Sequence, residues 1–329
     1  MNVLFIFRRF NIQFQSIEEL FKQVIATLSN KVDCQVYEVT HSSTGLKNRL
    51  EILSETKKLS ADIYHITGDI HFAALALPRN LTILTIHDLG TYDNLTGISK
   101  FVFWLFWIYL PVKRVKYITV ISEATKQHLV KLVSIDPGKI SVIHNPLIGD
   151  FKPFKKEFNK DCPVILQIGI TENKNIIRLA EALSDIPCQL VILGIPSEKQ
   201  KMALKHYKIN YKTYHSLTRA QVIEQYNNCD LVTFISTHEG FGLPIIEANA
   251  VGRPVITSNI SSMPEIAGDS AYLVDPFSVT DIRNGINELI ANDSHRDDLV
   301  KKGFENVKRF SQEDISDQYF RLYKKILEN

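Results

Sequence analysis

The sequence of 329 residues has few cysteines and almost no net charge. Its four cysteines are far apart and form no CxxC pair, so neither a zinc site nor a redox motif is indicated. Isolated cysteines of this kind are typical of reduced thiols in a cytoplasmic protein. The net charge of +2 gives no basic belt, and we expect no nucleic-acid partner.

Two short motifs are also missing. No GxGxxG follows an apolar strand-like run, which argues against a dinucleotide dehydrogenase. No Asp-x-Asp occurs anywhere, so a common carboxylate pair for a divalent metal is absent, and no metal or other cofactor is expected. The apolar residues Val3–Phe7 lie at the start of the sequence without a charged leader, and they predict a first strand rather than a signal peptide.

The most informative stretch reads as a strand, a glycine loop and a helix. Leu231–Ile235 is a short apolar run that predicts a buried strand. Gly240 and Gly242 follow, and glycine lets the backbone turn sharply and approach a ligand closely. Pro244 suits the first turn of a helix, and Gly252 is placed to end that helix.

A helix that starts near Leu243 directs its free N–H groups and the positive end of its dipole at this loop. Such a helix start is suited to phosphate. Glu239 precedes the helix and Glu247 lies in its first turns, so the stretch suggests a ligand with both phosphate and hydroxyl groups. An ordinary turn with two solvated glutamates explains the same pattern equally well, since strand–glycine–helix turns are common in α/β folds.

Strand-like and helix-like segments alternate along the chain, which predicts parallel, doubly wound sheets. An aperiodic segment from about Pro146 to Pro163 interrupts the alternation and indicates a linker. We therefore expect a Rossmann-like acceptor domain over 1–150, a donor domain over 151–311, and a C-terminal helix over 312–329 that packs back toward the first domain. Two such domains would face each other across a cleft.

The helix starts carry recognisable caps. Ser122 is a predicted N-cap for a helix over 123–133. Thr218 with Gln221, and Ser262 with Glu265, have the spacing of capping boxes.

Residues 238–276 carry a family resemblance. They read His-Glu-Gly-Phe-Gly-Leu-Pro-Ile-Ile-Glu-Ala, followed by Gly252–Ile256, Pro264-Glu265 and Leu273–Pro276. This pattern, with two glutamates separated by seven residues, resembles the group 1 family of retaining glycosyltransferases (GT4), which have the GT-B fold. Three further segments are similar to that family: Thr85–Asp88, Val120–Glu123 and Gly169–Asn175.

The resemblance implies a metal-independent, retaining transfer of a sugar from a nucleotide-diphosphate sugar to a sugar or lipid-linked acceptor in surface polysaccharide synthesis. The implied catalytic residues are His87, Glu239 and Lys174, with Lys174 neutralising the leaving diphosphate. By the same resemblance, Glu239 would contact the donor sugar, and orientation of that sugar is favoured over a nucleophilic role. Glu247 would bond the ribose hydroxyls. The remaining implied donor contacts are Gly169, Asn175, Tyr214, His215, Ser216, Leu217, Phe241, Gly242 and Leu243.

The chain departs from the family in two loops. The residue after Gly169 is Ile170, where the family often has arginine, so Lys174 or another cation has to carry the diphosphate charge. The first loop contains Arg8 and Arg9 in place of glycines, and arginine binds phosphate bidentately. With residues at expected strand ends, they form the acceptor or phosphate candidates: Arg8, Arg9, His65, Asp69 and Asp88. A purely structural role remains an alternative for each of them.

Phe101–Val112 is apolar on every face and contains both tryptophans, yet twelve residues are too few to span a bilayer. Flanking lysines and an arginine suit an anionic membrane surface, so peripheral binding at the inner face of the cell membrane is one interpretation. Burial against the first sheet, or a contact between copies, is the other.

Two functional alternatives stay open. One is a non-catalytic sugar-nucleotide-binding subunit, although the intact set of Glu239, Glu247 and Lys174 argues against it. A GT-B enzyme that hydrolyses or epimerises a sugar nucleotide fits the same motifs.

Overall fold

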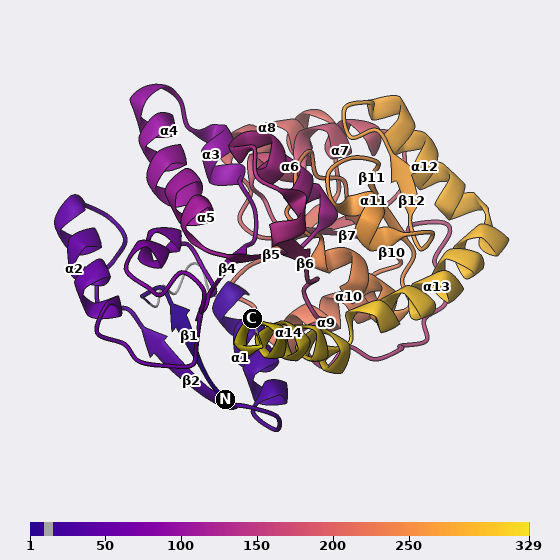
Figure 1. Ribbon diagram of the computed structural model, residues 1–329. Helices are drawn as coiled ribbons and strands as arrows, with labels where there is room; N and C mark the ends of the chain where they lie inside the picture. Colours follow the sequence, from indigo (N-terminus) through magenta and orange to yellow (C-terminus); the bar gives the residue numbers. More distant parts are fainter. Residues whose placement is uncertain (10–15, 329) are drawn as a thin grey trace. The chain divides into compact units, whose positions relative to one another are not determined.

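The computed structural model describes residues 1–9 and 16–328, so part of the first loop lies outside the described residues. The chain divides into two compact units. The first unit joins Met1–Pro146 to Ser311–Asn329, and the second is the continuous segment Leu147–Phe310. Figure 1 gives the order of the elements along the chain.

The first unit contains a six-stranded sheet in the order β2-β1-β3-β4-β5-β6, in which every pair is parallel. The central strands are continuously buried, as expected when helices cover both faces of a parallel sheet. Its strands are β1 (Asn2–Phe7), β2 (Asp33–Glu38), β3 (Ile63–Ile66), β4 (Thr82–Ile86), β5 (Tyr117–Val120) and β6 (Ile140–Val142). Its helices are α1 (Ser16–Leu28), α2 (Leu46–Thr56), η1 (His71–Leu75), α3 (Gly90–Asn94), α4 (Gly97–Phe103), η2 (Trp104–Tyr109), α5 (Leu110–Arg114), α6 (Glu123–Val133), η3 (Pro137–Lys139) and α14 (Gln312–Leu327).

The last helix, α14, completes the core of the first unit. Tyr319 packs against Phe21 of α1 with ring centroids 6.0 Å apart, and Tyr323 lies edge-on to Phe5 of β1 at 6.4 Å. All four rings are buried. Residues from the two ends of the described chain therefore share one hydrophobic core.

The second unit repeats the architecture, with a parallel sheet in the order β12-β11-β10-β7-β8-β9. The predicted parallel α/β organisation is thus confirmed in both units. Its strands are β7 (Val164–Ile168), β8 (Gln189–Leu193), β9 (Tyr211–Tyr214), β10 (Leu231–Phe234), β11 (Val255–Ser258) and β12 (Tyr272–Val274). Its helices are η4 (Glu172–Lys174), α7 (Ile176–Ala182), α8 (Glu198–His206), α9 (Arg219–Asn228), α10 (Leu243–Val251), α11 (Met263–Ala267), α12 (Val279–Ala291), α13 (Asp293–Val307) and η5 (Lys308–Phe310).

Local sequence signals explain several helix boundaries. Pro244 lies in the first turn of α10, and Gly252 ends it in the left-handed conformation (φ 76°), both as predicted. Ser122 and Thr218 accept hydrogen bonds from the third residue beyond them, so the predicted caps of α6 and α9 are confirmed.

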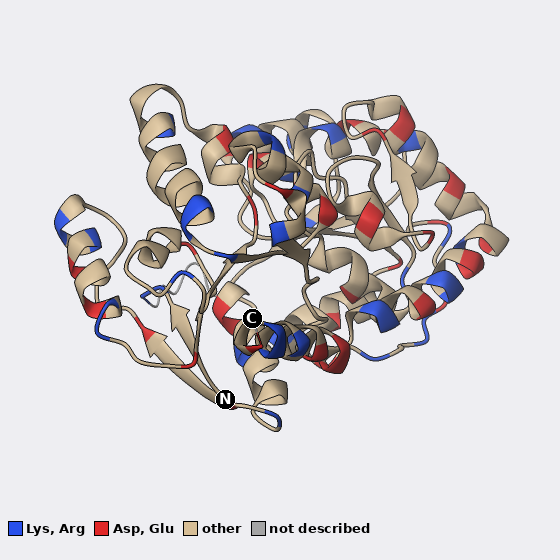
Figure 2. Cartoon of the chain, in the orientation of Figure 1, with Lys and Arg blue, Asp and Glu red and all other residues tan. Residues whose placement is uncertain are grey.

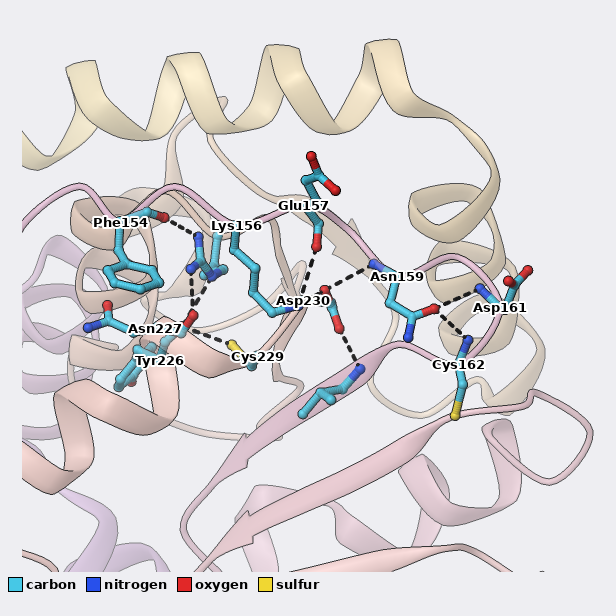
Figure 3. A network of polar contacts seen from close by, with 12 residues as sticks. Phe154, Lys156, Glu157, Asn159, Asp161, Cys162, Tyr226, Asn227, Cys229 and Asp230 are labelled. Atoms are coloured by element: carbon cyan, nitrogen blue, oxygen red, sulfur yellow. Dashed lines mark hydrogen bonds and ion pairs between the residues drawn. The ribbon is translucent and has the colours of Figure 1, made fainter.

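The aperiodic segment between β6 and β7 is anchored to the second unit by a buried carboxylate (Figure 3). Asp230, which is 3% exposed, pairs with Lys156 and accepts hydrogen bonds from the backbone N–H groups of Asn159 (3.2 Å) and Val164 (2.8 Å). Arg253 donates to the carbonyl of Phe154 at 2.9 Å. The segment is irregular in conformation but fixed by specific polar contacts.

Candidate active site

The candidate donor site lies at the point in the second sheet where the strand order changes direction, between β7 and β10. β7 and β10 are neighbours, while the chain extends through β8 and β9 on one side and through β11 and β12 on the other. Ligands of doubly wound sheets bind at this switch point, beyond the carboxyl ends of the strands. The two loops predicted to hold the donor, after β7 and after β10, are the loops at this point.

The central contact is an ion pair between these two loops. Lys174 donates from Nζ to Oε1 of Glu239 at 2.5 Å, and the two side chains are only 17% and 16% exposed. Asn173 donates from Nδ2 to the same oxygen at 3.0 Å and to the carbonyl of His238 at 2.8 Å. The backbone N–H of Thr237 returns a bond to the Asn173 carbonyl at 2.8 Å. Asn173, which the sequence analysis did not single out, thus joins the loops.

Two residues shape the first loop for this contact. Gly169 has a φ of 81°, and a Cβ there would lie 3.0 Å from Cε of Lys174, so the lysine runs across the bare glycine. Asn175 is left-handed (φ 61°), a conformation that asparagine tolerates, and its Nδ2 donates to the carbonyl of Pro276 at 2.6 Å. Nζ of Lys174 also lies 4.5 Å from the ring centroid of Phe234.

The glycine loop after β10 is held by two serines. Ser261 donates to the carbonyl of Glu239 at 2.7 Å, and Ser262 donates to that carbonyl at 3.0 Å and to the carbonyl of Phe241 at 2.5 Å. The predicted capping box of Ser262 with Glu265 is therefore wrong, since Ser262 makes no side-chain cap bond to α11. Its hydroxyl binds the glycine loop instead. Gly242 (φ 127°) then leads into Leu243, the first residue of α10.

Glu247 is buried on α10, with only 4% of its surface exposed. Its Oε1 accepts from Nη2 of Arg219 at 2.6 Å, and its Oε2 accepts from the hydroxyl of Tyr226 at 2.6 Å. Burial and the neighbouring carboxylate raise the pKa of Tyr226 well above its usual value, so the phenol stays a donor. The interpretation of Glu247 as a solvated glutamate is wrong. Arg219 and Tyr226 were not anticipated.

The loop expected to lie against the nucleotide base is open to solvent. Tyr214, His215 and Ser216 are exposed, and Leu217 is half-buried. Ser216 has a φ of 55°, which turns the chain sharply toward α9. These residues come just before α9, whose first residue, Arg219, contacts Glu247. The loop therefore leads straight to a partner of Glu247.

In the first unit, His87 lies at the end of β4 and is 9% exposed. Its Nε2 donates to the carbonyl of Thr67 at 2.8 Å, because a carbonyl is only an acceptor. The pKa of His87 is lowered, mainly by burial, so the ring is neutral. Because Nε2 carries the proton that is donated to Thr67, Nδ1 is the unprotonated nitrogen. The ring of His87 is thus anchored to the loop after β3.

His65 is a core residue, which corrects its prediction as an acceptor contact. It lies inside β3 and is fully buried. Its Nδ1 bonds the hydroxyl of Tyr323 at 2.8 Å, and its Nε2 bonds Oγ1 of Thr85 at 2.7 Å. Both ring nitrogens are occupied by protein, and burial lowers the pKa of His65 to about 3.

Arg8 is engaged by two carboxylates and is 16% exposed. It contacts both oxygens of Glu18, at 2.7 and 3.3 Å, and reaches Asp69 at 2.7 Å. Its charge is thus already balanced by protein, which argues against the predicted phosphate contact. Arg9 is exposed.

Asp69 and Asp88 line a pocket of ≈ 410 Å³ in the first unit. Arg49 also lines it, with its guanidinium 4.4 Å from the ring centroid of Trp107. Burial lowers the pKa of His71, another lining residue, so its ring adds no charge to the pocket. The remaining lining residues are Ser43, Thr44, Leu89, Thr91, Leu95, Ser99, Val102, Phe103 and Ile108.

Phe101–Val112 forms one continuous helical stretch through α4, η2 and α5. One side is core: Trp107 is 7% exposed and packs 4.9 Å from the ring of Phe72. The other side is open, with Phe101 59% and Phe106 43% exposed. In Figure 2, α4 and α5 carry residues in the colour of Lys and Arg and none in the colour of Asp and Glu. Within residues 1–9 and 16–328, no helix is long and apolar enough to cross a bilayer, and no cluster of three or more metal-ligating side chains occurs.

The chain is similar to known proteins along most of its length. A structure of HepE from Anabaena, in complex with UDP and glucose, matches 99% of this chain and 100% of that one with a TM-score of 0.76 at 15% identity. Together with the two parallel sheets, this likeness confirms the predicted GT-B fold class. The family profile "Glycosyl transferases group 1" matches residues 149–306, and "Glycosyltransferase Family 4" matches residues 39–147. The two matched segments follow one another in the sequence and together run from residue 39 to residue 306. The chain belongs to the group 1, GT4-like glycosyltransferases.

Two curated relatives are mannosyltransferases. O-antigen chain mannosyltransferase RfbU of Salmonella typhimurium is 28% identical over 243 residues, which make up 71% of this chain and 65% of the relative. O-antigen chain mannosyltransferase B of Escherichia coli is 40% identical over 94 residues, 28% of this chain and 25% of the relative. The chain thus matches from a quarter to about two thirds of the length of these relatives.

Proposed function

We propose that the protein is a retaining glycosyltransferase that moves a sugar from a nucleotide-diphosphate sugar to a sugar or lipid-linked acceptor in polysaccharide synthesis. The observation that carries the proposal is the ion pair of Lys174 and Glu239 at the switch point of the second sheet, beside the start of α10. A fixed cation suits a diphosphate, and a fixed carboxylate suits sugar hydroxyls.

The leaving diphosphate gains negative charge as the glycosidic bond breaks through an oxocarbenium-like transition state. Nζ of Lys174 and the N–H groups at the start of α10 supply the opposing charge without a metal. Glu239 holds the donor sugar in place, and Glu247 bonds the ribose hydroxyls. His87, with a neutral ring and an unprotonated Nδ1, accepts a hydrogen bond from a sugar hydroxyl.

The acceptor binds in the pocket that Asp69 and Asp88 line. The pocket contains two carboxylates, those of Asp69 and Asp88, and the guanidinium of Arg49. The carboxylates would repel a phosphate group, so the pocket favours an uncharged sugar that is rich in hydroxyl groups. Phe101 and Phe106, with Lys100, Lys113 and Arg114, dock on an anionic membrane surface and bring the pocket to a lipid-linked acceptor. Failure to float with phosphatidylglycerol liposomes would remove this membrane contact.

A donor screen tests the proposal. The thermal midpoint is measured with UDP-, GDP-, ADP- and dTDP-sugars, and a nucleotide-activated mannose comes first because two relatives are mannosyltransferases. A true donor raises the midpoint by mass action. No shift with any donor overturns the proposal. Binding without turnover identifies a non-catalytic subunit, and turnover without an acceptor identifies a hydrolase or epimerase.

Retention and metal independence have their own tests. Product NMR reports whether the anomeric configuration of the donor is kept. Excess EDTA leaves the rate unchanged if the protein's own cations neutralise the diphosphate, whereas complete loss of turnover shows that a metal is needed.

A further inference from the structure

Glu247 is a buried carboxylate whose orientation depends on two neighbours from α9. Arg219 is the first residue of that helix, and Tyr226 lies two turns further on. Each binds a different oxygen of Glu247 at 2.6 Å. An ionised carboxylate has about four acceptor positions on its two oxygens. Both oxygens therefore keep a position for a ligand while the protein fixes the plane of the group.

Arg219 is itself fixed by the segment that enters the second unit. Its Nη2 also donates to the carbonyl of Ile148 at 2.5 Å, and its guanidinium carbon lies 4.8 Å from the ring centroid of Phe151. Gly149 lies between these two residues with a φ of 91°, and a Cβ there would come within 2.9 Å of Nε of Arg219. Carbonyl, glycine and ring together hold the planar guanidinium.

Arg219 is the first residue of α9, and this position indicates that its charge serves a partner on another element rather than its own helix. A cation at a helix N-terminus faces the positive end of the dipole, which is unfavourable by itself. Glu247 offsets that cost by pairing with the guanidinium. Lysine is a poor substitute, because its ammonium group has no planar face to stack on the ring of Phe151.

We propose that Arg219 is a positioning residue of the donor site, which holds Glu247 in the orientation that recognises ribose and ties it to Ile148–Phe151. This inference rests on the proposed function, in which Glu247 bonds the ribose hydroxyls. Tyr226 supports the second oxygen in the same way. Removing Arg219 leaves a buried carboxylate with one neutral partner, Tyr226, and the group is then free to turn toward water.

Ribose discrimination is the readout, since a general loss of packing would not change it selectively. Calorimetry on the whole protein measures binding of UDP, GDP and ADP, then of the 2′-deoxy and 3′-deoxy forms of whichever binds. We expect the wild type to prefer the ribose form by roughly tenfold, one hydrogen bond to a charged group. Arg219→Ala should lose most of that preference and Arg219→Lys part of it.

Arg283→Ala is the matched control. Arg283 is 35% exposed, against 38% for Arg219, and it also donates to backbone carbonyls, at 3.0 and 2.8 Å, but it contacts neither Glu247 nor the glycine loops. It should keep the wild-type preference. Tyr226→Phe, which deletes one hydroxyl, carries the test if Arg219→Ala does not fold, and it should also reduce the preference.

The outcomes separate the inference from the function beneath it. If the wild type binds none of these three nucleotides and no dTDP either, the proposed function fails and the inference fails with it. If dTDP alone binds, the function stands and the inference is overturned, because Glu247 then recognises no ribose. If the wild type prefers ribose and Arg219→Ala keeps that preference, the inference alone is overturned. Where Arg219→Ala does not fold, an unchanged preference in Tyr226→Phe overturns it in the same way. A wild type that binds without any ribose preference also overturns it, because Glu247 then reads no hydroxyl.

Discussion

Nζ of Lys174 lies 2.5 Å from Oε1 of Glu239, and this pair joins two loops that come from neighbouring strands. With both side chains less than one fifth exposed, the pair is shielded from most of the solvent. The pair thus holds the side chain of Lys174 in place. Under the proposed function, a diphosphate that binds here would compete with Glu239 for Nζ of Lys174.

Lys174→Met should lower kcat by roughly 10²–10³-fold, because it removes a fixed charge that opposes the developing negative charge on the leaving group. Initial rates at saturating donor measure this effect. Lys201→Met is a control, since Lys201 also pairs with a single glutamate, Glu198, at 2.8 Å, but on the exposed surface of α8. Wild-type rates in Lys174→Met would contradict the assigned role.

Glu239→Gln distinguishes an orienting role from a covalent one. The amide keeps an oxygen that can accept from Nδ2 of Asn173, so we expect more than about a tenth of the wild-type rate if Glu239 orients the sugar. Loss of a covalent nucleophile costs several powers of ten. A rate below about 10⁻⁴ of wild type, with donor binding intact, would reverse our assignment.

Stability should fall on acidification because of His65. Its folded pKa is about 3, while the unfolded chain binds a proton there near pH 6.5. Between these values the unfolded state holds more protons, so the free energy of unfolding decreases as the pH falls from 6.5 toward 3. From pH 6.5 to 4.5 this group alone contributes a loss of about 2–3 kcal/mol.

Urea titrations of wild type and His65→Gln at several pH values measure this contribution. The variant is expected to be less stable at pH 7.5, since it loses the bonds to Tyr323 and Thr85. Its stability should nevertheless change less steeply with pH. Parallel curves for the two proteins would show that His65 does not titrate as its burial implies.

The thiols of Cys162, Cys188 and Cys229 should react at different rates. Cys162 is exposed, whereas burial raises the pKa of Cys188 to about 11 and that of Cys229 to about 12. A thiolate is the reactive form. A disulfide reagent at pH 8 should label Cys162 first and the two buried thiols only after unfolding, and Cys162→Ser should abolish the fast phase. Fast labelling of Cys229 would contradict its burial.

Local signals explain why so much of the donor loop was predictable. Gly242, Pro244 and Gly252 act through backbone conformation, which depends on neighbours in sequence, and they set the start and end of α10 as expected. The resemblance added Glu239 and Lys174, and the structure brings these two side chains together.

Side-chain partners from distant positions were not predictable in this way. Arg219 meets Glu247 across 28 residues, and His65 meets Tyr323 across 258. Nothing in the local pattern of Ser262 shows that its hydroxyl serves the loop at Glu239 rather than its own helix. The cation at the start of α9 was the one available clue to Arg219, because helix dipoles disfavour it. The helix α13 was missed altogether.

The chain leaves the first unit at Pro146 and re-enters it at Ser311. During synthesis, the whole of Leu147–Phe310 therefore emerges from the ribosome before α14 does. Until then, Phe5 and Phe21 lack their contacts with Tyr323 and Tyr319 of α14. The unit translated second has all its residues available first. Until α14 emerges, the nascent chain presents an apolar surface that suits a chaperone, and a messenger truncated before codon 311 yields a product with that surface permanently open.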